Sequence, residues 1–96
     1  MRYAIGTMTD LTKIRRALKL LAGYPPESQG ELIGEPWEVS NGNGIMEMPT
    51  DADEYLGQSI DVDGVEVFVP NEGQLYERTQ LPQAYQDFLY NRENQW

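Results

Sequence analysis

Three carboxylates stand within four residues in the middle of the chain, at Asp51, Asp53 and Glu54. Closely spaced carboxylates are the groups that general acid–base catalysis and divalent cations use. Either chemistry needs further partners, and the 96 residues contain no histidine and no cysteine. Thiolate or imidazole nucleophiles, zinc sites built on those ligands and disulfides are therefore excluded. We interpret the three acids as solvated groups at the start of a helical turn, and we expect no enzyme activity, no metal and no cofactor.

A second group of acids, in residues 59–64 (SIDVDG), has part of the spacing of a calcium-binding loop. Such a loop needs an acid at its first position and a bidentate glutamate at its twelfth. Those positions hold Ser59 and Pro70 here. Valines at alternate positions on both sides of Asp63 and Gly64 favour two strands joined by a tight turn. The pattern thus predicts a β-hairpin rather than a metal site.

Charge is distributed unevenly along the chain. The formal net charge is −9, from seven Lys and Arg against sixteen Asp and Glu. The segment between Lys19 and Arg78 holds thirteen acids and no basic residue. Random placement rarely leaves so long a gap without a cation, so composition alone does not explain it. One interpretation is that the acids keep the protein soluble and its strand edges unpaired, with a basic helix lying against an acidic sheet.

The other interpretation is that the middle segment presents a carboxylate surface to a basic partner. Duplex DNA carries one negative charge per ~1.7 Å of its axis, so the grooves that bind it are rich in Lys and Arg. Carboxylates on strands and loops can occupy the same grooves. In size and charge the chain resembles the small acidic inhibitors that phages and mobile elements direct at nucleic-acid-binding proteins, anti-CRISPR proteins among them. This resemblance implies a non-enzymatic inhibitor that mimics nucleic acid.

We therefore predict a protein-binding module whose partner has a basic surface and belongs to a nucleic-acid-binding protein or complex. Nucleic acid and anionic membranes are not expected as direct partners, because both repel a chain of this charge. The alternative is a structural or assembly accessory protein that binds through exposed apolar and aromatic residues. The residues predicted to contact the partner are Glu47, Asp51, Asp53, Glu54, Tyr55, Asp61, Glu66, Tyr90 and Trp96.

The elements that position these residues begin with a short strand over residues 1–5. A helix follows, with Thr7 and Asp10 spaced as a capping box, and it should end at Gly23. Apolar residues recur at helical spacing within it and predict its buried face. These residues are Leu11, Ile14, Leu18 and Leu21.

Two hairpins and a second helix are predicted after a loop over residues 25–36. Residues 37–39 and 45–48 should be strands joined by a loop of about four residues around Asn41–Gly44, and 60–62 and 65–69 should flank the turn at Asp63. Residues 50–56 fit one helical turn, residues 75–78 a third strand beside the second hairpin, and residues 81–89 a C-terminal helix.

Together these elements predict one α+β domain over residues 1–96. We expect an antiparallel β-sheet of about four to six short strands, containing two hairpins, with the N-terminal and the C-terminal α-helix packed on one face. No apolar stretch approaches the ~18 residues that span a bilayer, and no signal-peptide pattern is present at the start of the chain, so we expect a cytoplasmic location.

Overall fold

The first strand runs directly into the first helix. In the computed structural model, which describes residues 1–24 and 33–94, β1 (Arg2–Thr7) is followed at once by α1 (Met8–Leu21). The Thr7 hydroxyl accepts a hydrogen bond of 3.1 Å from the main-chain N–H of Asp10, which caps the helix and forms the Thr7 half of the predicted capping box. The helix ends at Leu21, and Gly23 takes the left-handed conformation just beyond it, with φ of 78°.

Four strands form an antiparallel sheet in the order β2-β3-β1-β6. β3 (Asn43–Met48) pairs with β1 along its whole length, and β2 (Trp37–Ser40) covers the other edge of β3. The loop between β2 and β3 contains two residues rather than about four. Asn41 and Gly42 have φ of 48° and 81°, the positive values that a two-residue hairpin turn requires, and β3 therefore begins at Asn43.

The second predicted hairpin forms a separate two-stranded sheet. It consists of β4 (Ser59–Val62) and β5 (Val65–Phe68), joined by Asp63 and Gly64 with φ of 52° and 86°. The third strand expected beside this hairpin is instead β6 (Tyr76–Glu77), and it pairs with β1. The prediction was wrong because a short 3₁₀ helix, η2 (Glu72–Gln74), redirects the chain between β5 and β6.

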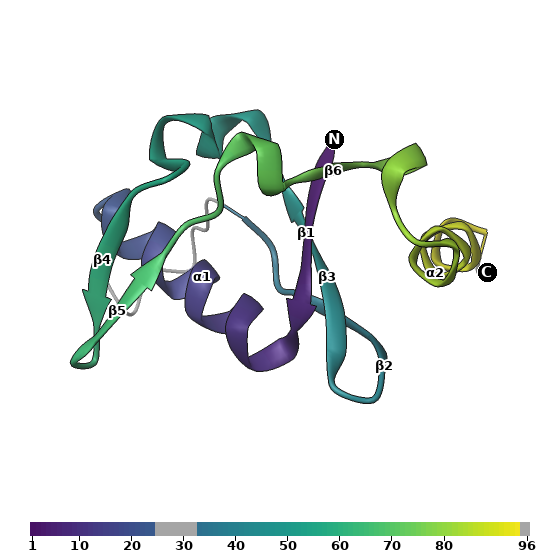
Figure 1. Ribbon diagram of the computed structural model, residues 1–96, viewed down its shortest axis with the longest axis horizontal. Coiled ribbons are helices and arrows are strands. Elements are labelled where there is room, and N and C mark those ends of the chain that lie inside the picture. The colour runs from purple at the N-terminus through teal and green to yellow at the C-terminus, as the bar shows by residue number, and fades with distance from the viewer. Residues whose placement is uncertain (25–32, 95–96) are drawn as a thin grey trace.

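The sheet is covered by helices on both faces. Ala4 and its partner Met46 point toward α1, and the apolar core on this side extends to the β4–β5 hairpin. Tyr3 and Ile45 project from the opposite face and pack with Leu89 of α2 (Gln83–Glu93). Figure 1 accordingly shows β4–β5 at one end, then α1, the four-stranded sheet and α2 at the other end.

The predicted α+β class and both terminal helices are confirmed, but the helices do not share a face of the sheet. β1 contains three consecutive apolar residues, Tyr3, Ala4 and Ile5. Apolar side chains therefore project from both faces of the sheet, and a helix packs on each face. Of the four helix positions predicted to be buried, Leu11 and Leu18 are fully buried, and Ile14 and Leu21 are partly buried against the same core.

Two more 3₁₀ helices connect these elements. η1 (Thr50–Tyr55) occupies the predicted helical turn, and η3 (Arg78–Gln80) leads into α2. None of the helices in the described part of the chain has the length and apolar character needed to cross a membrane. Most of the predicted loop over residues 25–36, and Trp96, lie outside the described residues.

Candidate protein-binding site

The residues predicted to contact a partner lie at two ends of the molecule. Asp51, Asp53, Glu54 and Tyr55 belong to η1, and Asp61 and Glu66 belong to the β4–β5 hairpin, on the α1 side of the sheet. Glu47 lies in register with Tyr3, on the face of the sheet that α2 covers, and Tyr90 lies on α2 itself. Figure 1 shows that α2 and the hairpin are at opposite ends of the fold, so one small interface does not include all of these residues.

Asp61 and Glu66 form a pair of like charges on the exposed face of the hairpin. They lie directly opposite each other in the β4–β5 register, and both are exposed. Asp61 Oδ1 accepts a hydrogen bond of 2.9 Å from the N–H of Gly64, and Glu66 Oε2 accepts one of 2.9 Å from Ser59 Oγ. Neither carboxylate forms a salt bridge with a described Lys or Arg. The hairpin therefore holds two oriented negative charges in solvent that form no salt bridge with a described cation.

The acids around η1 surround an arginine. Arg2 Nη2 forms a salt bridge with Asp53, and Arg2 Nη1 lies 3.8 Å from Glu72. Glu77 is the register partner of Arg2 on β6, and these residues line a pocket of about 450 Å³. The side chain of Arg2 is only 14% exposed, so its charge is directed into the pocket. Asp53 is exposed but paired with Arg2, whereas the exposed acids Asp51 and Glu54 of η1 form no salt bridge with a described cation.

Two further salt bridges join elements at the edges of the fold. Arg16 on α1 contacts Asp63 in the hairpin turn at 2.7 Å. Arg78 donates two hydrogen bonds to the carboxylate of Glu93, of 2.7 and 2.6 Å, and this pairing lowers the pKa of Glu93 and raises the pKa of Arg78. The basic residues outside the acidic segment thus neutralise particular acids in the folded chain.

Two of the predicted contact residues, Tyr55 and Glu47, are partly buried in the fold. Tyr55 is partly buried and packs against the α1-side core, and a hydrogen bond with Glu54 raises the pKa of its hydroxyl. Glu47 is likewise only partly exposed. Burial raises the pKa of Tyr3, and the negative charge of Glu47 raises it further. Tyr90, by contrast, is 63% exposed.

Two exposed apolar residues on β5 are not among the predicted contact residues. Phe68 is 64% exposed and Val65 is 54% exposed, and they flank Glu66 and Val67 in the same strand. Phe68 falls on the same outward phase as Glu66, because side chains alternate along a strand and Val67 points into the core. The same strand alternation that turns Glu66 outward therefore also places Phe68 on its side of β5.

No group of three or more Asp and Glu side chains that could hold a metal ion occurs within residues 1–24 and 33–94. Comparison of the chain with protein-family models, curated proteins and solved structures finds no match.

Proposed function

We propose that this chain is a non-enzymatic, acidic protein-binding module that occupies the basic groove of a nucleic-acid-binding protein. The observation that carries the proposal is the Asp61–Glu66 pair, exposed, oriented by hydrogen bonds and without a salt bridge to a described cation. Like charges placed directly opposite each other across two strands reduce stability. Attraction to a basic surface is a gain that offsets this cost.

The proposed contact surface is the hairpin acids together with Asp51 and Glu54 of η1, which are exposed on the same side of the four-stranded sheet. A Lys- or Arg-lined groove recognises such charges through its long-range field, which also accelerates association. By occluding that groove, the chain competes with nucleic acid. This mode of action corresponds to inhibitors of the phage and mobile-element type, including anti-CRISPR-like proteins, and it needs no catalysis.

The experiment has two stages, and the second one decides. The immobilised chain captures proteins from a lysate, and a captured protein with a basic surface is purified with a fluorescent duplex DNA that it binds. The chain is then titrated into that complex at fixed ionic strength. Stoichiometric release of the DNA supports the proposal. Simultaneous binding of the DNA and the chain, with neither weakening the other, contradicts it.

Variants of the hairpin test whether its charge carries the competition. D61N combined with E66Q should weaken DNA displacement by about tenfold or more, since a loss of about 1.4 kcal/mol corresponds to tenfold in affinity. E38Q combined with D87N is the matched control. It removes the same charge from two exposed acids that also accept hydrogen bonds, from Gly42 N–H and the Gln83 amide. Displacement by this control should stay within about twofold of the original.

A second candidate function follows from the exposed ring of Tyr90 at the opposite end of the fold. An accessory subunit held through this aromatic surface would bind its partner with an affinity that salt leaves unchanged. Binding by the acidic hairpin instead weakens as ionic strength rises, because attraction between exposed charges is screened over ~8 Å at physiological salt. Affinity measured for the captured protein between low and high salt distinguishes the two functions.

A further inference from the structure

Within residues 1–24 and 33–94, no strand pairs with the side of β5 that faces away from β4. β5 pairs with β4 alone among the described residues, from Ser59↔Phe68 to Val62↔Val65. In a hairpin with a two-residue turn, the residues flanking the turn form a hydrogen-bonded pair, and the bonding direction alternates from there. The N–H and C=O groups of Val65 and Val67 thus face β4. Those of Glu66 and Phe68 face outward and are available to another strand.

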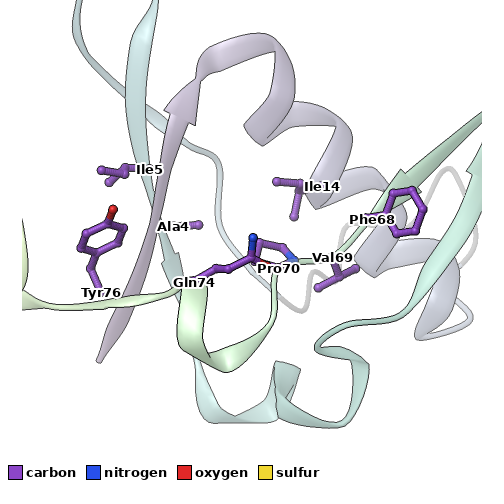
Figure 2. A pocket seen from close by; sticks show the side chains of 8 residues that line it. All are labelled: Ala4, Ile5, Ile14, Phe68, Val69, Pro70, Gln74 and Tyr76. Carbon is purple, nitrogen blue, oxygen red and sulfur yellow. The ribbon is translucent and has the colours of Figure 1, made fainter.

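A groove runs along this edge. Its first part, about 340 Å³, lies between β5 and the start of α1, with Ile14 and Lys13 among its lining residues. Its second part, about 450 Å³, continues past Val69 and reaches Ala4 of β1. The two parts share Ile14 and Phe68, so they adjoin each other along β5. Figure 2 shows Ile14 between β1 and β5, with Phe68 at the β5 wall and Ala4 at the β1 wall.

The far wall of the groove is also an incompletely paired strand. β6 pairs with β1 only at Arg2 and Tyr3, so the β1 edge beyond Tyr3 has no strand beside it in the described structure. The N–H of Met8 donates to the carbonyl of Gly42, which lies on the β3 side. By alternation, the main-chain groups of Ile5 face the groove. The space is therefore bounded by strand edges on two sides and by an apolar side chain of α1 between them.

We infer that this groove binds an extended basic segment of the partner protein, which adds as a strand to the open edge of β5. The inference rests on the proposed function, because the basic character of the segment is that of the partner. Main-chain hydrogen bonds with Glu66 and Phe68 hold such a segment, and alternate apolar side chains contact Ile14 and Val69. The bound segment also covers the ring of Phe68, which is 64% exposed at the rim of the groove.

Charge selects this occupant over a second copy of the chain. Among the described residues, the rim carries Glu66 and Asp10 and one cation, Lys13, and Asp61 lies beside Glu66 on the hairpin. Lysines or arginines on the solvent side of an added strand lie close to these carboxylates. A second copy brings a net charge of −9 against an equal charge, so strand exchange between two copies is disfavoured.

The probe is a short synthetic peptide of alternating valine and lysine, in three forms. One form is unmodified, one has N-methyl groups on all valines, and one has them on all lysines. In a strand, the N–H groups of alternate residues face opposite edges, so only one of the two methylated sets blocks pairing with β5. We expect one methylated peptide to bind about as well as the unmodified one and the other to lose at least tenfold in affinity, measured by fluorescence anisotropy.

Two measurements on the protein locate the peptide. Hydrogen exchange of the Glu66 and Phe68 amides should slow when the peptide binds, whereas the Val67 amide, which already faces β4, should change little. F68S should weaken peptide binding about tenfold. L20S, which removes an exposed apolar side chain on the part of α1 that lines a different pocket, is the control and should leave affinity unchanged.

The outcomes separate this inference from the proposed function. No binding, or equal binding by all three peptides, overturns strand addition and leaves the acidic surface to be judged by DNA displacement alone. Strand addition of a valine–glutamate peptide with equal affinity overturns the basic character of the occupant and with it the inference, whereas the proposed function is still decided by DNA displacement. A dimer of the chain in sedimentation that F68S dissociates assigns the edge to a second copy and overturns the inference.

Discussion

Removing the Asp61–Glu66 charge pair should stabilise the fold, by an amount that the register predicts. Directly opposite residues have Cβ atoms about 5 Å apart, so we take the carboxylates to be about 6 Å apart in solvent. The repulsion between unit charges at that distance in water is about 0.7 kcal/mol without salt. Screening reduces it to about 0.6 kcal/mol at an ionic strength of about 10 mM and to about 0.1 kcal/mol at about 1 M.

The variant that tests this value is D61N combined with E66Q. Asparagine and glutamine keep an oxygen that accepts from Gly64 N–H and Ser59 Oγ, so the hydrogen bonds of the hairpin are retained. For a domain of this size, 1 kcal/mol corresponds to about 4–8 °C in Tm. We expect Tm, followed by circular dichroism, to rise by about 2–5 °C at the lower ionic strength and by less than about 1 °C at the higher one.

Loss of net charge alone also stabilises an acidic chain, and the variant E38Q with D87N measures that part. Both residues are exposed acids that accept one hydrogen bond, and neither faces another acid across a strand. If the control raises Tm as much as the hairpin variant does, the repulsion between Asp61 and Glu66 is not specific. The reasoning that the pair is kept at a cost to stability is then refuted.

Three other outcomes are expected. L18A should cost about 2–5 kcal/mol in urea unfolding because Leu18 is fully buried, whereas L20A, on the same helix but 41% exposed, should change stability by less than about 0.5 kcal/mol. Because Arg78 lowers the pKa of Glu93, the pair stabilises the fold at neutral pH and ceases to do so as pH falls through that lowered pKa; E93Q should therefore flatten the acid side of a Tm-against-pH curve. Calcium, magnesium or zinc should give no saturable rise in Tm, and one that D61N abolishes would contradict the absence of a metal site.

Elements specified by neighbouring residues could be predicted from the sequence. The Thr7 cap, the Gly23 end of α1 and the Asp63–Gly64 turn depend on residues a few positions apart, and all three occur as predicted. Pairings between distant segments could not be predicted in this way. The position of β6 beside β1 depends on how η2 turns the chain, and its strand pattern alone fits either sheet equally well.

The features of the candidate site that depend on neighbouring residues could also be predicted, and those that depend on distant residues could not. The outward position of Asp61 and Glu66 follows from the alternation of β4 and β5. The pairing of Asp53 with Arg2 does not follow from the alternation of any strand, because Arg2 is 51 residues away in the sequence. The separation of Glu47 from the other acids depends on which helix covers each face of the sheet, and neighbouring residues carry no information about that.

Salt bridges in the folded chain offset part of the charge separation that the sequence shows. Arg2 contacts Asp53 and Glu72, and Arg16 contacts Asp63, so part of the charge separation along the sequence is cancelled in space. The hairpin pair is left without such a contact among the described residues, and Glu66 shares its outward phase on β5 with Phe68. Charge, an exposed ring and free main-chain groups therefore coincide on one four-residue strand. A partner that uses all three must present an extended segment that is both basic and apolar. This requirement selects fewer proteins than a basic surface alone does.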